Sequence, residues 1–127
     1  MILRRLWPLL ADLACVLALA IGGKSSHEAG DSDWVVLAIV CPFALAVVVA
    51  HGVLLGRDRP ARRLWPEGIT VLAVTYVVGM LLRALSGRGL AAGFLVVAAL
   101  FLAVTMLGWR CVAWVVERAC RHRRASA

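Results

Sequence analysis

The sequence LAAGFLVVAALFLAVTMLGWRCVAWVV occupies residues 90–116 and is the last long apolar run of the chain. Between Leu90 and Trp109 no residue is charged. As an α-helix this stretch is long enough to cross the ~30 Å hydrocarbon layer of a membrane. A helix of a soluble protein has little reason to be apolar on every face for about five turns. The run therefore predicts a membrane span, which Arg110 interrupts near its end.

The composition of the whole chain also indicates a membrane protein. Of its 127 residues, 63% are hydrophobic and 17% are charged, and the mean hydropathy is +0.91. These values lie outside the range of soluble domains. The formal net charge of +7 comes from short basic clusters beside apolar runs. That placement favours membrane orientation and contact with anionic lipid headgroups over nucleic-acid binding.

Four apolar runs predict an all-α, polytopic membrane protein, with four transmembrane helices in an antiparallel bundle and a single domain over residues 1–127. Asp12 lies within the first run and argues against its being a cleaved secretory signal. Gly22-Gly23 is expected to end the first helix, and Pro66 to lie near the start of the third. The expected spans are residues 6–22, 34–55, 68–85 and 90–116, and a basic tail follows at 117–127.

The distribution of Lys and Arg predicts the orientation of the bundle. The N-terminus, the second loop and the tail carry excess arginine, whereas the first and third loops do not. Because cytoplasmic segments are the Lys/Arg-rich ones, both termini are expected in the cytoplasm. Four spans also require both ends on one side. Tryptophans near the span ends are expected at headgroup level; they are Trp7, Trp34, Trp65, Trp109 and Trp114.

Three ionisable residues within the predicted spans, Asp12, His51 and Arg110, are expected to lie at one depth. Each is six or seven positions from a flanking charged residue, which at ~1.5 Å per residue is about 10 Å below the cytoplasmic surface. An acid or arginine at mid-membrane costs roughly 2.5 kcal/mol or more, so each needs a partner. One interpretation is a structural cluster in which Asp12 pairs with Arg110 and His51 bonds to one of them. Another is an inward-open polar pocket for an ion, proton or headgroup. A third is that Arg110 extends to the interface.

A second group of polar candidates belongs to the outer side of the membrane. Arg83 lies near the outer end of the third span and shares a helix face with Thr75 and Gly79. Its side chain is expected to reach the outer headgroups or an acid of the first loop such as Glu28. The alternative is an outer site for an anionic ligand. The further residues of such a site are Lys24, His27 and Arg88.

Small residues and one proline within the spans are expected to mediate helix packing. Small side chains let helix backbones approach closely, and proline is tolerated in a membrane helix when neighbours satisfy the freed carbonyl. The pattern leaves open whether the contact lies within one bundle or between protomers. The positions are Pro42, Thr75, Gly79 and Gly108.

The sequence lacks the patterns that carry catalytic or metal chemistry. It contains no H-E-x-x-H, no phosphate-binding glycine loop and no G-x-S-x-G elbow. Its four cysteines form no C-x-x-C pair, and they indicate packing residues rather than disulfides or zinc ligands. We therefore expect a non-enzymatic protein with no catalytic residue, metal or cofactor.

Several short motifs occur together in this chain. In combination they resemble those of the small actinobacterial membrane proteins grouped as domain-of-unknown-function family 3054, over roughly residues 6–117. The resemblance implies a four-span protein of the bacterial cytoplasmic membrane, and it implies no activity. The motifs are Asp12 in the first span, Gly23-Lys24-Ser25-Ser26-His27, Pro42, Trp65-Pro66-x-Gly68, Gly79-Met80-x-Leu82-Arg83 and Gly108-Trp109-Arg110.

Two functional hypotheses follow from these features. The first is a structural or accessory membrane component that binds lipid or a membrane partner, either as a homo-oligomer or within a larger membrane complex. The second is a minimal transporter or an ion or proton pathway that uses Asp12 with His51 and Arg110. Nucleic acid is not an expected partner in either case.

Overall fold

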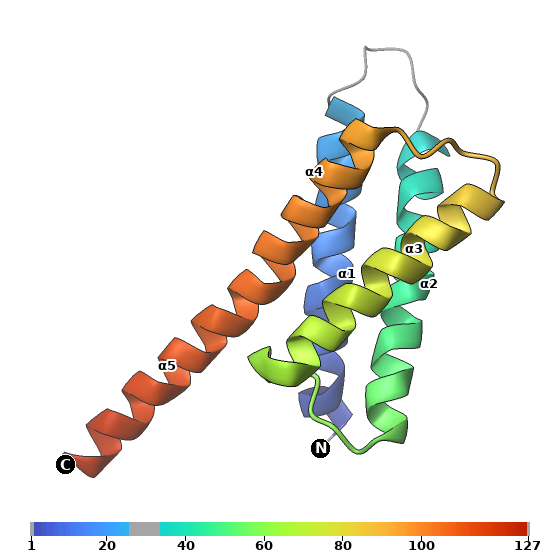
Figure 1. The fold of residues 1–127 in the computed structure, drawn as a ribbon. Helices are drawn as coiled ribbons and strands as arrows, with labels where there is room; N and C mark the ends of the chain where they lie inside the picture. Colours follow the sequence, from blue (N-terminus) through green and yellow to red (C-terminus); the bar gives the residue numbers. More distant parts are fainter. Residues whose placement is uncertain (1, 26–33, 127) are drawn as a thin grey trace.

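The computed structural model describes residues 2–25 and 34–126, and over these residues its regular structure is entirely helical (Figure 1). The prediction of an all-α fold is confirmed. A short kinked turn, η1, in which the backbone of Trp65 is extended, precedes α3. A π-helical turn, η2, joins α4 and α5 into one continuous helix. The elements are α1 Ile2–Ser25, α2 Trp34–Gly56, η1 Leu64–Gly68, α3 Ile69–Leu85, α4 Ala92–Leu102, η2 Ala103–Leu107 and α5 Gly108–Ala125.

Four of these helical segments are long and apolar enough to cross a membrane, as the sequence predicted. Two helices run further than expected. α1 continues through Gly22-Gly23 to Ser25, because glycine weakens a helix without having to end it. The last helix continues through the basic tail to Ala125. The candidate spans are Leu6–Gly23, Val36–Gly56, Leu64–Leu85 and Ala92–Ala125.

The core of the bundle is built around one face of α2. Phe43, Val47 and Ala50 are fully buried and recur every three or four residues, so they lie on one side of the helix. This face packs against α1 and α3, and the same core cluster includes Ala98 and Leu102 of the last helix. The four segments are therefore held together by a shared apolar core.

Large apolar side chains also cover the outside of the bundle. Leu10, Leu45, Leu81 and Leu100 are each more than half exposed, one on each of the four spans. Such a surface would be an association liability in water. In a bilayer it is the expected lipid-facing surface, because the helices satisfy their own backbone hydrogen bonds and present these apolar side chains to the lipid.

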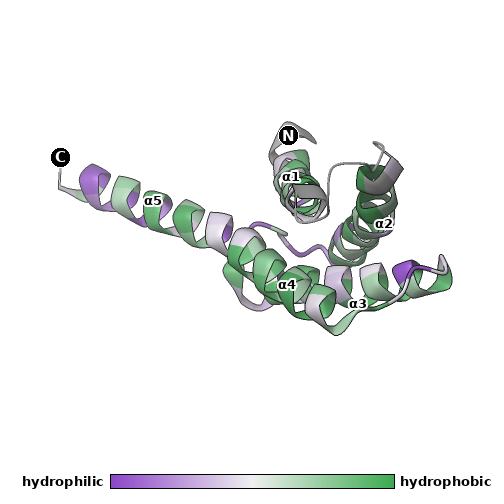
Figure 2. Cartoon of the chain, turned by 90° about the horizontal axis from the view of Figure 1, so that it is seen from above, coloured by the Kyte–Doolittle hydropathy of each residue, from purple (hydrophilic) through white to green (hydrophobic). Residues whose placement is uncertain are grey.

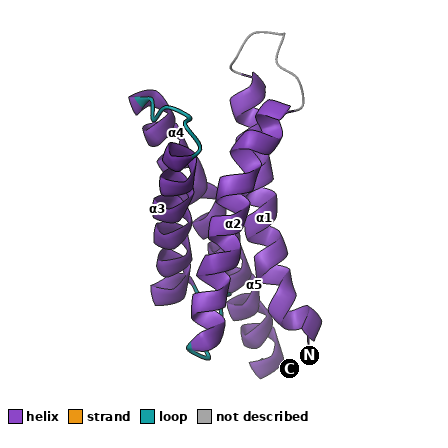
Figure 3. Cartoon of the chain, turned by 90° about the vertical axis from the view of Figure 1, so that its right-hand side faces the viewer, coloured by secondary structure: helices purple, strands orange, loops and turns teal. Residues whose placement is uncertain are grey.

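Both ends of the chain lie at the same end of the molecule (Figures 1 and 3). The loop between α2 and α3 is at this end too, and the connection from α3 to α4 is at the opposite end. Seen from above, α5 extends away from α1 and α2 (Figure 2). The short loop between α2 and α3 therefore lies where it can contact both α1 and the start of α5.

Candidate functional site

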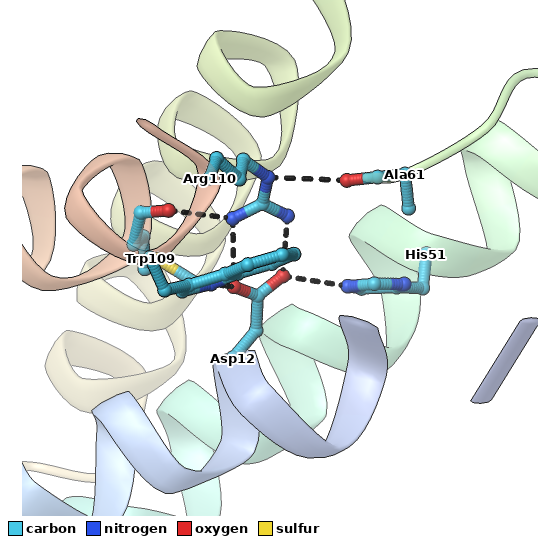
Figure 4. A network of polar contacts seen from close by, with 6 residues as sticks. Asp12, His51, Ala61, Trp109 and Arg110 are labelled. Carbon is cyan, nitrogen blue, oxygen red and sulfur yellow. Dashed lines mark hydrogen bonds and ion pairs between the residues drawn. The ribbon is translucent and has the colours of Figure 1, made fainter. Parts of the chain in front are cut away.

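The structure brings Asp12 of α1, His51 of α2 and Arg110 of α5 into one polar network (Figure 4). Asp12 and Arg110 are fully buried, and the His51 side chain is 11% exposed. Three spans that are far apart in the sequence thus contribute one charged or polar group each to a common site. The network fixes how these three helices face one another.

The Asp12 carboxylate accepts hydrogen bonds at both of its oxygens. Oδ1 accepts from Arg110 Nη1 at 2.8 Å and from Trp109 Nε1 at 2.9 Å. Oδ2 accepts from Arg110 Nη2 at 2.7 Å, and His51 Nε2 lies 2.8 Å from the same oxygen. Because a carboxylate only accepts, this contact requires a hydrogen on Nε2 of His51. The pairing of Asp12 with Arg110 is bidentate, the strongest geometry for these groups.

The guanidinium of Arg110 is held from several sides. Its Nε donates to the carbonyl of Ala61 at 3.1 Å, and its Nη1 donates to the carbonyl of Met106 at 2.8 Å. The first carbonyl belongs to the loop between α2 and α3, so Arg110 also ties this loop to the last helix. Since Arg110 is fully buried, the interpretation in which its side chain extends to the interface is wrong.

Trp109 contributes to the network in a way that its position near a span end did not indicate. The indole N–H of Trp109 donates to Asp12. The Arg110 guanidinium lies 4.2 Å from the centre of the Trp109 ring. The ring of Trp109 also packs edge-on against that of Trp7, with 4.8 Å between the ring centroids. Cation–π contacts of this kind are strengthened when the cation is desolvated. Trp109 therefore orients both members of the ion pair instead of lying free at the headgroups.

Gly68 provides the space that the Arg110 side chain occupies. A Cβ atom at this position would lie 2.8 Å from Cδ of Arg110, 3.0 Å from the carbonyl oxygen of Arg63 and 3.3 Å from Nε of Arg110. The first of these separations is shorter than real Cβ contacts allow. Glycine is therefore needed at the end of η1, directly before α3, for the guanidinium to reach the Ala61 carbonyl.

The two buried charges of the site, on Asp12 and Arg110, neutralise each other. A buried charge without a partner is costly, whereas a bidentate pair whose remaining donors and acceptors are also bonded offsets much of that cost. Asp12 supplies one negative charge and Arg110 one positive charge, and backbone carbonyls take further donors of Arg110. The arrangement can hold helices in a fixed register, because its contacts join α1, α2, the loop between α2 and α3, and the last helix.

A second buried acid, Glu67, lies in η1 and was not singled out by the sequence. It is 2% exposed, and Arg59 Nη1 lies 3.4 Å from its Oε1. Its Oε2 has no hydrogen-bond partner in the described part of the chain. Its place directly before Gly68 in the Trp65-Pro66-x-Gly68 motif was the available signal.

The outer candidates do not form a comparable network within the described residues. The Arg83 guanidinium lies 4.1 Å from the centre of the Phe94 ring, and its Nε and Nη1 are buried without a hydrogen-bond partner there. Arg88 is exposed, and its backbone N–H donates to the carbonyl of Arg83 at 3.3 Å. The side chain of Lys24 lies outside the described part, as do His27 and Glu28.

The four expected packing positions differ in what they contact. Pro42 and Thr75 are buried, and a Cβ at Gly79 would lie 2.4 Å from Cδ1 of Phe43, so α2 and α3 meet closely there. Gly108 differs from them, because a Cβ there would meet nothing within 4 Å. Among the described residues, Gly108 therefore makes no close packing contact with another helix.

The fold and the buried network define an integral membrane protein of four spans whose helices are joined by an intramembrane ion pair. The chain belongs to the family described as Protein of unknown function (DUF3054), which matches residues 9–113. The matched region includes Asp12, His51 and Arg110. Comparisons with curated proteins and with solved structures give no significant match.

Proposed function

We propose that this protein is a non-enzymatic structural or accessory component of the bacterial cytoplasmic membrane, with both termini in the cytoplasm. The bundle would act by presenting a rigid apolar and basic surface to lipid or to a larger membrane partner. The orientation is supported by the arginine-rich termini and second loop, because segments rich in Lys and Arg are retained on the cytoplasmic side.

One observation carries this proposal: protein groups already occupy both oxygens of the Asp12 carboxylate. Arg110, Trp109 and His51 all lie within hydrogen-bond distance of it. A transporter that bound its substrate or proton at this acid would first have to separate it from a buried bidentate partner. Removing one member of such a pair typically costs about 3–5 kcal/mol. A fixed pair therefore supports a structural role better than an exchanging one.

A proton or ion pathway is the second candidate, and one observation favours it. Among the three ionisable residues of the network, His51 is the partly exposed one, and it bonds directly to the buried acid. An imidazole between a carboxylate and the surface is suited to transferring a proton.

Purified protein in liposomes that contain a pH-sensitive dye separates these two functions. The wild type and Asp12→Asn are compared under an imposed proton gradient, and the amount of folded protein in the membrane is measured for both. A structural role predicts no proton flux above that of empty liposomes, and less folded Asp12→Asn protein. A pathway predicts flux in the wild type that is lost in Asp12→Asn while folding is unchanged, and this result would refute the structural proposal.

Purification in a mild detergent tests the accessory role. A larger complex predicts that a defined membrane protein co-purifies in fixed ratio and that its removal lowers the amount of this chain. If the chain is equally abundant without any such protein, the association with a protein partner is refuted and lipid remains the occupant of its surface.

A further inference from the structure

The last helix is longer than a bilayer requires, and its final part leaves the bundle. From Ala92 to Ala125 it has 34 residues, which at ~1.5 Å per residue is about 51 Å, against ~30 Å of hydrocarbon. Figure 1 shows α5 leaning away from the other helices, and in α5, which the structure describes in full, Arg110 is the one buried residue. The surface of α5 beyond Arg110 therefore faces the membrane and its interface.

The chemical character of α5 changes along its length. Val112, Val115 and Val116 are each more than half exposed, and the arginine-rich part follows at the end of the helix (Figure 2). A helix perpendicular to the membrane would cross the hydrocarbon in about 20 residues from Ala92, and a leaning one needs more. Because this helix leans, the membrane boundary falls beyond Cys111, near the change from valine at Val116 to arginine at Arg118.

A shallow groove lies on α5 at this boundary. Its lining combines apolar side chains with two basic ones, and the Arg118 guanidinium lies 5.3 Å from the centre of the Trp114 ring. The groove is lined by Trp114, Val115, Arg118, Ala119 and His122.

Arg118 has no carboxylate partner among the described residues. The acid next to it, Glu117, is already engaged on both oxygens, because Arg62 contacts Oε1 and Arg121 lies 3.8 Å from Oε2. The Arg118 guanidinium, which lines the groove, is therefore available to an anion from outside the chain.

We infer that this groove binds an anionic phospholipid of the leaflet on the side of the termini. The phosphate contacts the guanidinium of Arg118 and the ring of His122, while an acyl chain lies along Val115, Ala119 and the indole of Trp114. Apolar side chains beside a cation at headgroup depth match the two parts of such a lipid. The inference rests on the proposed structural role and names the lipid class that the surface of α5 takes.

Native mass spectrometry of the full chain tests this assignment. The protein is released from detergent containing equal amounts of phosphatidylglycerol and phosphatidylcholine, and the ratio of the two bound lipids is measured. Phosphatidylglycerol should be preferred in the wild type. Arg118→Gln should lower the preference about fivefold, which corresponds to ~1 kcal/mol for one cation near an anionic surface.

Arg124→Gln is the matched control, because it removes the same charge from the same helix without lining the groove. It should keep the preference within about twofold. If both variants lose the preference for phosphatidylglycerol equally, the lipid is attracted by the overall positive charge of the helix and not by this groove. A wild type without any preference for phosphatidylglycerol would refute the site directly. A wild-type dimer that Arg118→Gln dissociates would mean that a second copy fills the groove. None of these outcomes depends on Asp12, so failure here is distinct from failure of the proposed function.

Discussion

Substituting Gly68 by alanine tests how tightly the ion-pair network is built. The added Cβ would lie 2.8 Å from Cδ of Arg110 and 3.0 Å from the carbonyl oxygen of Arg63. The second obstacle is backbone, so relief has to come from the arginine. That side chain is held at Nε by the Ala61 carbonyl and at its Nη atoms by Asp12. It therefore cannot move without weakening one of these contacts.

The size of the effect follows from three opposing contributions. Alanine in place of glycine stabilises a helix by about 0.5–1 kcal/mol. Overpacking of a filled site costs about 1–3 kcal/mol. Displacing the guanidinium far enough to unpair Asp12 costs about 3–5 kcal/mol. We expect the clash to prevail and Gly68→Ala to lower the free energy of unfolding by about 2–4 kcal/mol.

Denaturant titration in mixed micelles, followed by tryptophan fluorescence, measures this change. Gly108→Ala is the matched control, because it adds the same methyl group to the same region where nothing lies within 4 Å. It should be as stable as the wild type or slightly more stable. If Gly68→Ala is as stable as Gly108→Ala, the close approach of Arg110 to the start of α3 is refuted.

Two further substitutions probe neighbouring contacts by the same titration. Trp109→Phe keeps an aromatic ring but removes the donor that lies 2.9 Å from Oδ1 of Asp12. It should lower the free energy of unfolding by about 1–3 kcal/mol, since the lost hydrogen bond is to a buried charge. An unchanged stability would contradict this hydrogen bond. Gly79→Ala would place a Cβ 2.4 Å from the fully buried ring of Phe43 and should cost about 1–3 kcal/mol. Adding Phe43→Leu should recover part of that loss, and a failure to recover would show that the strain lies elsewhere.

The spans and the level of the polar network were predictable from the sequence. Hydrophobic length alone defines a membrane helix, and counting residues from flanking charges places Asp12, His51 and Arg110 at one depth. A charge in lipid requires a partner, and opposite charges at one depth are the obvious choice. The four-span fold and the meeting of these side chains follow from two properties of each helix that its own sequence contains, namely its hydrophobic length and the depth of its ionisable residue.

Other parts of the site could not be read from such patterns. The carbonyl of Ala61 and the space at Gly68 depend on the path of the loop between α2 and α3, which periodicity does not encode. Trp109 resembles an interfacial tryptophan in sequence, and its bond to Asp12 requires knowing how the last helix is rotated. The lean of α5 is equally hidden, because helix length says nothing about which neighbours a helix has.

A double-mutant cycle between Asp12 and Arg110 tests most directly whether an ion pair joins the first and last spans. The free energy of unfolding is measured for the wild type, Asp12→Asn, Arg110→Gln and the double variant. Each single variant leaves a buried charge without its partner, so each should be strongly destabilised, and the double variant should be more stable than the sum of the two losses allows. We predict a coupling free energy of about 2–3 kcal/mol. Additive losses, with no coupling beyond ~0.5 kcal/mol, would contradict the account.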